Sequence, residues 1–214
     1  LRSRVTFESS GLSIEGVLHS PDTAEPTPGI VMCHPHPLYG GSMSSSVVVS
    51  VCEQLNSRGI SALRFNFRGV GGSQGRYEEG RGEVDDALAA VSLLTTLPAV
   101  NPARIGIAGY SFGAYVALRA AVDDERIAAA AAISPPVGLF DLTFFQSYHL
   151  PKMLISGAED DIVNPQEFLT FVEKTSEPKV WELAKYADHF WGGLERWVGT
   201  RVADFFANVF GTGT

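Results

Sequence analysis

A glycine-flanked serine is the residue best suited to chemistry in this chain. Ser111 lies at the centre of a G-x-S-x-G pattern over residues 109–113. The pattern follows a short apolar run at 105–108 and precedes a helix-favouring run at 114–122, so the context is strand, tight turn and helix. Only glycines can flank such a turn, because a Cβ there would collide with the neighbouring strand or helix. The turn presents the Ser111 hydroxyl as a nucleophile at the sheet edge, and simple capping of a helix is the alternative.

Acids and a histidine follow Ser111 in two later loops. The loop after the second-last predicted strand contains Glu159, Asp160 and Asp161, and the loop after the last one contains His189. In α/β sheets the ligand binds outside the carboxyl ends of the strands. Ser111, an acid and His189 are therefore expected at one sheet edge, in the chain order Ser, Asp, His.

The elements that must position these residues alternate along the chain. An opening β-hairpin is expected, followed by strands that alternate with helices, which predicts an α/β fold with a mostly parallel central sheet covered by helices on both faces. The expected strands cover 5–7, 12–18, 29–33, 60–67, 105–108, 127–133, 152–157 and 179–183. The expected helices cover 47–57, 83–97, 114–122, 165–174 and 194–210.

Composition limits the classes of partner. The 214 residues, 45% of them apolar, predict a single domain over 1–214. The formal net charge is −8 and there is no basic run, so we expect no nucleic-acid partner. No apolar run is long enough to span a bilayer, so we expect no membrane partner. Cys33 and Cys52 are too few for a disulfide framework, which favours a cytoplasmic location.

Two histidines in the first strand-end loop raise the question of a metal. His34 and His36 alternate with Pro35 and Pro37, which hold the loop extended. No third ligand is identifiable, whereas a catalytic zinc usually has three protein ligands. We therefore expect no metal and no cofactor, and we expect the histidines to buttress the loop.

The motifs together resemble a known family. The Arg68-Gly69 loop, the elbow at Ser111, a G-x-x-D acid loop ending at Asp160 and the motif Asp188-His189-Phe190 occur in the order of the α/β-hydrolases. The chain resembles this superfamily over nearly its whole length. It is most similar to the small, cap-less, dienelactone-hydrolase-like branch whose first loop reads His-Pro-His-Pro followed by a Gly-Gly pair.

The resemblance implies a fold and roles for three residues. It implies an α/β-hydrolase fold without a cap domain, Ser111 as the nucleophile, His189 as the general base and Asp160 as the acid that orients the imidazole. Asp161 is an alternative to Asp160, because boundaries read from sequence can be one residue off. Glu159 is better explained as a solvated loop charge.

An oxyanion hole needs two N–H donors. One is expected from Phe112, which follows the nucleophile, and the other from the loop after the first parallel strand. The prolines of that loop have no N–H, which leaves His36, Leu38, Tyr39 and Gly40. In related loops that read His-Gly, the residue directly after these two supplies the N–H donor. The additional Pro-Leu-Tyr of this chain is expected to move the donor to a later residue of the loop. Our choice is Leu38.

The substrate pocket is expected to be shallow and open. The segment from Pro135 to Leu150 is too short for a lid. The aromatic residues of this segment are Phe140, Phe144, Phe145 and Tyr148. They either line the pocket or pack in the core, and the sequence does not decide between the two. The residues predicted to bind substrate are Tyr39, Tyr110, Phe140 and Phe144. Arg68 is expected to brace neighbouring loops.

The predicted function is a serine carboxylesterase that cleaves small, short-chain carboxylic esters through an acyl-enzyme. The expected partner is a small-molecule ester, and both monomer and homodimer remain open. Thioesterase and peptidase activities on the same triad are alternatives. A non-catalytic binding module is a further alternative, which the complete Ser, Asp and His set disfavours.

Overall fold

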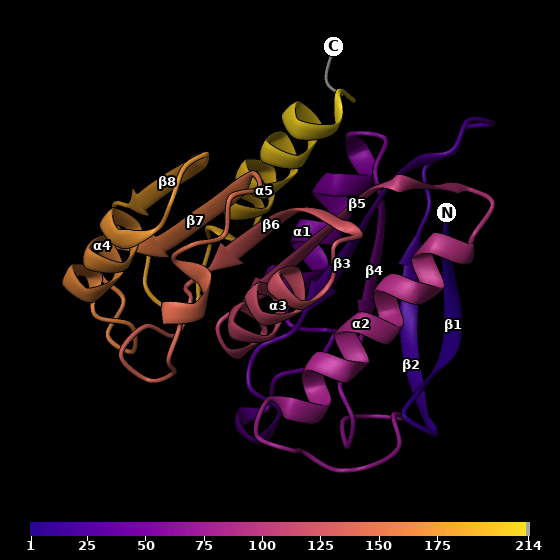
Figure 1. Ribbon diagram of the computed structural model, residues 1–214, viewed down its shortest axis with the longest axis horizontal. Helices are drawn as coiled ribbons and strands as arrows, with labels where there is room; N and C mark the ends of the chain where they lie inside the picture. Colours follow the sequence, from indigo (N-terminus) through magenta and orange to yellow (C-terminus); the bar gives the residue numbers. More distant parts are fainter. Residues whose placement is uncertain (213–214) are drawn as a thin grey trace.

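A single eight-stranded sheet runs through the computed structural model, which describes residues 1–212 (Figure 1). The order across the sheet is β1-β2-β4-β3-β5-β6-β7-β8. β1 and β2 form an antiparallel hairpin and β2 pairs antiparallel with β4, whereas all other neighbours are parallel. The strands are β1 (Arg2–Ser9), β2 (Leu12–His19), β3 (Thr27–Cys33), β4 (Ser61–Phe65), β5 (Val100–Tyr110), β6 (Ile127–Ile133), β7 (Lys152–Gly157) and β8 (Lys179–Ala184).

Helices cover both faces of this sheet. The helices are α1 (Ser46–Ser57), α2 (Arg81–Thr96), α3 (Phe112–Asp123), α4 (Pro165–Lys174) and α5 (Glu195–Phe210). α1 and α5 pack together on one face, and their apolar side chains form one core with that face. The side chains of α2, α3 and α4 form a second core with the other face. The two layers lie on opposite sides of the strands (Figure 1).

The predicted α/β-hydrolase architecture is confirmed, with small differences at element ends. α2 begins at Arg81 rather than at residue 83, because the Glu83 carboxylate accepts the Gly80 N–H at 2.8 Å and so closes the first turn. β5 begins at Val100, where its register with β3 shifts.

The loops at the carboxyl ends of the strands carry the candidate site. One residue of the candidate site lies in each of the loops that follow β3, β5, β7 and β8. The segment 134–151 between β6 and β7 holds one short 3₁₀ turn, η2 (Thr143–Phe145), and no inserted domain. The predicted absence of a cap is therefore correct for this segment.

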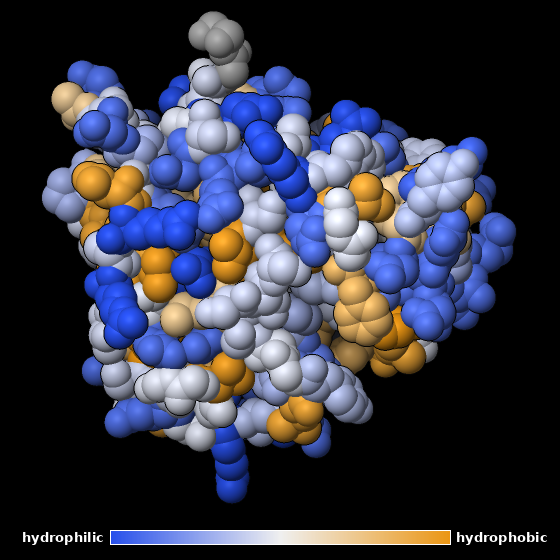
Figure 2. Space-filling view, turned by 180° about the vertical axis from the view of Figure 1, so that it is seen from behind, coloured by the Kyte–Doolittle hydropathy of each residue, from blue (hydrophilic) through white to orange (hydrophobic). Residues whose placement is uncertain are grey.

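The surface is mainly polar on the face behind that of Figure 1. Hydrophobic side chains on it occur in small groups between hydrophilic ones (Figure 2). None of the helices within residues 1–212 has the length and apolarity required to cross a membrane.

Candidate active site

Ser111 occupies a strained turn between β5 and α3. Its φ of 55° and ψ of −123° lie outside the conformations that side chains ordinarily adopt. The turn leaves no room for a side chain on either flank. A Cβ on Gly109 would collide with the carbonyl of Gly113, and a Cβ on Gly113 would collide with the carbonyl of Cys33. The Ser111 N–H donates to the carbonyl of Ile133 at 2.8 Å, which fixes the turn to β6. The predicted elbow geometry and the need for both glycines are confirmed.

His189 connects Ser111 to an acid. Its Nε2 lies 2.9 Å from the Ser111 Oγ, and its Nδ1 lies 2.8 Å from the Asp160 Oδ2. An ionised carboxylate only accepts, so the neutral imidazole carries its proton on Nδ1, and Nε2 is left to accept from the serine hydroxyl. His189 is 4% exposed and Asp160 5% exposed, so water competes little for either contact.

The carboxylate that faces His189 belongs to Asp160. Its Oδ1 accepts the N–H groups of Ile162 at 3.0 Å and Val163 at 2.7 Å, and these bonds orient its Oδ2 toward the imidazole. Asp161 and Glu159 are exposed. The structure therefore brings together Ser111, His189 and Asp160 and leaves the two neighbouring acids in solvent.

His34 anchors the loop that follows β3. Its Nε2 accepts the Phe67 N–H at 3.0 Å, so its Nδ1 carries the proton and donates to the carbonyl of Pro35 at 2.6 Å. Burial lowers the pKa of His34 from 6.5 to about 4, since a charged imidazole would lose its hydration. His34 thus buttresses the loop, as predicted, and the lowered pKa keeps it neutral there.

The structure contradicts the choice of Leu38 as an oxyanion donor. Pro37–Tyr39 form a 3₁₀ turn, η1, capped by His36, and the Leu38 N–H donates to His36 Nδ1 at 3.2 Å. The Tyr39 N–H donates to the carbonyl of His36. The extra Pro-Leu-Tyr therefore folds onto itself, which engages the N–H groups of Leu38 and Tyr39. Within residues 1–212, the N–H groups of His36 and Phe112 have no protein acceptor.

A cavity of about 780 Å³ opens above Ser111 and His189. Its walls come from the β3–α1 loop, the elbow, the segment after β6 and the loops after β7 and β8. The lining residues are Pro35, His36, Tyr39, Gly40, Gly41, Ser45, Ser46, Tyr110, Ser111, Phe112, Pro136, Leu139, Phe140, Ile162, His189 and Phe190. Its rim is open, with Tyr39 86% and Phe190 62% exposed.

Three of the four predicted substrate-binding residues line this cavity, namely Tyr39, Tyr110 and Phe140. Phe144 does not. It lies on η2, with its ring centroid 6.1 Å from that of Tyr115 and the Arg119 guanidinium carbon 5.1 Å from its centre. Sequence reasoning missed Leu139, Ile162 and Phe190. Phe190 belongs to the predicted histidine motif, so its place beside His189 was a usable signal.

Neither histidines nor cysteines form a metal cluster within residues 1–212. Cys33 and Cys52 are both buried and free. Burial raises the pKa of Cys52 to about 12 and that of Cys33 further, so both remain protonated at neutral pH.

The sheet, the strained elbow and the loop order define the α/β-hydrolase superfamily. Residues 10–155 match the X-Pro dipeptidyl-peptidase family (S15 family), and the chain belongs to that family. It is 35% identical over 195 residues to the uncharacterized protein RP471 of Rickettsia prowazekii, covering 87% of this chain and 81% of that protein.

Two further relatives indicate the class of chemistry. A solved serine hydrolase without lid from Xanthomonas campestris superposes with a TM-score of 0.87 at 27% identity, covering 98% of this chain and 95% of that one. A polyketide transferase of Penicillium crustosum is 33% identical over 73% of this chain and 52% of its own length. The chain is thus an enzyme of the serine-hydrolase type, a hydrolase or an acyl-transferase.

Proposed function

We propose that this protein is a carboxylesterase that hydrolyses small esters through a serine acyl-enzyme. The observation that carries the proposal is the continuous contact from Ser111 through His189 to Asp160 at the base of an open cavity. A serine hydroxyl is a poor nucleophile at neutral pH unless a base removes its proton during attack. The 2.9 Å contact with Nε2 supplies that base.

The reaction follows in two balanced halves. Ser111 Oγ bonds to the ester carbon while its proton passes to His189 Nε2, and Asp160 stabilises the resulting imidazolium. The imidazolium then protonates the departing alkoxide, which leaves as the alcohol and frees Nε2. Water then attacks the acyl carbon and gives its proton to His189 Nε2. The bond to Ser111 Oγ breaks, the imidazolium returns the proton to Oγ, and the carboxylic acid leaves.

The attack on the ester and the attack on the acyl-enzyme each form a tetrahedral intermediate. Its negative oxygen needs hydrogen-bond donors. We assign these to the N–H groups of Phe112 and His36, which lack protein acceptors and whose residues both line the cavity. The two rings lie with centroids 4.9 Å apart, so the residues are neighbours. Loss of one such donor typically lowers kcat by about 10²–10³.

The cavity favours neutral esters over the substrates of an aminopeptidase. An enzyme that removes dipeptides from an amino terminus must accommodate a free ammonium group, which is costly to desolvate without an opposite charge. None of the residues lining the cavity is Asp or Glu. The half-buried, apolar ring of Phe140 on its wall suits an uncharged acyl group.

Acyl transfer to an alcohol is the second candidate. It uses the same acyl-enzyme, with a hydroxyl compound in place of water in the second half. The likeness to a polyketide transferase supports it, as does the open rim that leaves room for an acceptor.

The test combines labelling and a substrate panel. Wild type should react covalently with a fluorophosphonate and hydrolyse p-nitrophenyl acetate, and Ser111→Ala should do neither. Ser44→Ala is the matched control, because Ser44 is an exposed serine of the β3–α1 loop that does not line the cavity. The panel adds thioesters, X-Pro anilides and alcohol acceptors. A higher kcat/KM for X-Pro anilides than for esters would refute the esterase proposal.

A further inference from the structure

Both ring nitrogens of His36 are engaged. Nδ1 accepts the Leu38 N–H at 3.2 Å, so in the neutral ring the proton lies on Nε2. That proton points to the hydroxyl oxygen of Tyr77, 3.2 Å away. The histidine that supplies a proposed oxyanion donor is therefore held from two sides, by its own turn and by a residue 41 positions further along the chain.

Tyr77 also contacts the other proposed donor residue. Its ring centroid lies 5.0 Å from that of His36 and 5.8 Å from that of Phe112. The His36 and Phe112 centroids are 4.9 Å apart, so the three rings form a closed triangle. The backbone N–H groups of two of its members are those assigned to the oxyanion.

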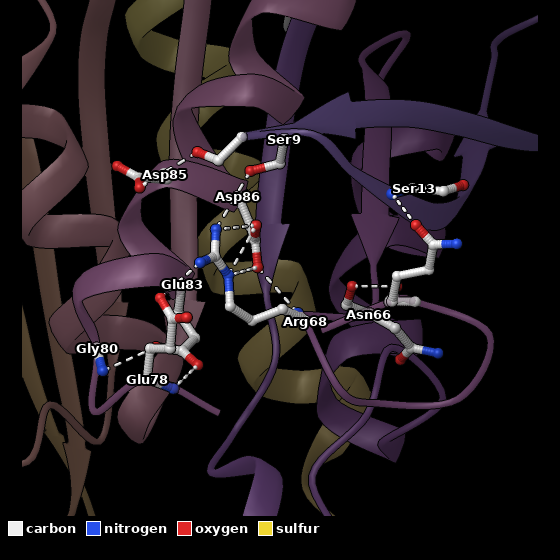
Figure 3. A network of polar contacts seen from close by, with 12 residues as sticks. Ser9, Ser13, Asn66, Arg68, Glu78, Gly80, Glu83, Asp85 and Asp86 are labelled. Carbon is white, nitrogen blue, oxygen red and sulfur yellow. Dashed lines mark hydrogen bonds and ion pairs between the residues drawn. The ribbon is translucent and has the colours of Figure 1, made fainter. Parts of the chain in front are cut away.

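The backbone beside Tyr77 is fixed by a partly buried network of ion pairs and hydrogen bonds (Figure 3). The Glu78 N–H donates to Glu83 Oε1 at 2.9 Å, and the Glu78 carboxylate accepts from Arg68 Nη1 at 2.7 Å. Arg68 is 3% exposed and is also bound through Nη2 to Asp86 at 2.8 Å. Tyr77 therefore projects from a rigid base, as a residue that positions another must.

The same β4–α2 loop holds the β3–α1 loop at two other points. The Phe67 N–H donates to His34, and the Asn66 Oδ1 accepts the Met43 N–H at 2.8 Å. These contacts hold the two ends of the β3–α1 loop, whereas Tyr77 contacts His36 between them. Removal of the Tyr77 hydroxyl should therefore leave the loop folded and free only the His36 segment.

We propose that Tyr77 is a positioning residue for the oxyanion hole, acting through its hydrogen bond to the His36 side chain. The inference rests on the proposed function and assigns it a further residue. Tyr77 touches no reacting atom. It holds the His36 peptide where its N–H meets the developing oxyanion, so its contribution belongs to the transition state and not to substrate binding.

The test is Tyr77→Phe, which removes the hydroxyl and keeps the ring. We expect kcat for p-nitrophenyl acetate to fall about 10-fold while KM changes less than about 2-fold, because a misplaced group costs rate without changing ground-state contacts. A trifluoromethyl ketone forms a tetrahedral oxyanion adduct with the serine, and its inhibition constant should rise by a similar factor. Tyr115→Phe is the matched control, since Tyr115 packs near Phe112 but does not line the cavity.

The outcomes separate the two proposals. If wild type hydrolyses esters and Ser111→Ala does not, but Tyr77→Phe keeps wild-type kcat and ketone inhibition, the role of Tyr77 is overturned alone. If Tyr77→Phe lowers kcat but leaves ketone inhibition unchanged, the effect does not pass through the oxyanion and the role is also overturned. If wild type neither hydrolyses esters nor binds the ketone, the proposed function fails and takes this inference with it.

Discussion

The Tyr110 hydroxyl donates a hydrogen bond to the backbone carbonyl of His189 at 2.7 Å. Tyr110 directly precedes Ser111 on β5, whereas His189 lies in the loop after β8. The bond is buried, and burial raises the pKa of Tyr110 well above its ordinary value, so the hydroxyl stays protonated and keeps donating. This contact sets the distance between the elbow and the histidine loop.

Tyr110→Phe should therefore impair catalysis more than binding. Removing the donor leaves a buried carbonyl unpaired, which should cost about 1–3 kcal/mol of unfolding free energy, and it lets His189 drift from Ser111. We expect kcat for a short-chain ester to fall about 10-fold with little change in KM. Steady-state kinetics and urea unfolding measure both effects. Tyr186→Phe is the control, being 69% exposed in the same loop; equal effects of the two variants would contradict this account.

Asp160→Asn and Asp161→Asn separate the two adjacent acids. Both changes are isosteric, but only Asp160 contacts the imidazole. An amide there can donate to Nδ1 and favour the wrong tautomer, so kcat should fall by about 10⁴, against less than about 3-fold for Asp161→Asn. Circular dichroism and thermal unfolding establish that each variant is folded. A larger loss of kcat with Asp161→Asn would mean that Asp161, and not Asp160, is the acid that orients His189.

Sequence alone predicted the parts of this site that depend on where parallel strands end and on where only glycine has room. Ser111 was identified because two glycines flank it between a strand and a helix. His189 and Asp160 were expected beside it because parallel strands end at one edge. Each inference depends on contacts within a few residues or on a rule of sheet topology.

The incorrect predictions concern how loops fold. Leu38 was chosen by counting residues, and the count failed because η1 closes on the His36 side chain. Phe144 was placed in the pocket because its segment borders it, but η2 turns its ring toward Tyr115. Tyr77 had no signal, since its position depends on the hydrogen bonds that the neighbouring Glu78 makes with Arg68 and with Glu83.

His34 should make stability depend on pH. Its folded-state pKa of about 4 lies below the ordinary 6.5, so the unfolded chain binds the proton more readily. The stability that neutral His34 contributes is thus full above about pH 6.5 and is lost as the pH falls toward 4. At pH 5 the loss should amount to about 2 kcal/mol.

His34→Gln removes this titration. The difference in unfolding free energy between wild type and the variant should be smaller at pH 5 than at pH 7.5 by about 2 kcal/mol, measured by urea unfolding. The pKa of His19 is also lowered to about 4, mainly by burial and next by Arg64, so His19→Gln should show a similar change. His149 is exposed and serves as the control. A difference independent of pH would mean that the pKa of His34 is the same in the folded and the unfolded chain.

The open cavity should limit the acyl chains that the enzyme prefers. Each methylene buried on an apolar wall contributes about 0.8 kcal/mol, but only while there is wall to cover it. The half-buried Phe140 offers such a wall, whereas Leu139 and Phe190 at the rim are each 62% exposed. An acyl chain that extends past the rim gains little further binding free energy, because its remaining carbons stay in water. We therefore expect kcat/KM to be highest for acyl groups of roughly two to six carbons and to fall for longer ones.

A series of p-nitrophenyl esters from acetate to palmitate, kept below the concentration at which micelles form, measures this preference. Phe140→Ala should lower kcat/KM for hexanoate more than for acetate, because acetate is too short to cover the Phe140 ring while hexanoate buries methylenes against it. Phe144→Ala is the matched control: its ring lies in the same segment but packs on Tyr115 outside the cavity, so the ratio between the two esters should not change. A maximum at ten carbons or beyond would contradict the open-wall argument, because it would require the rim side chains to close over the chain into a tunnel.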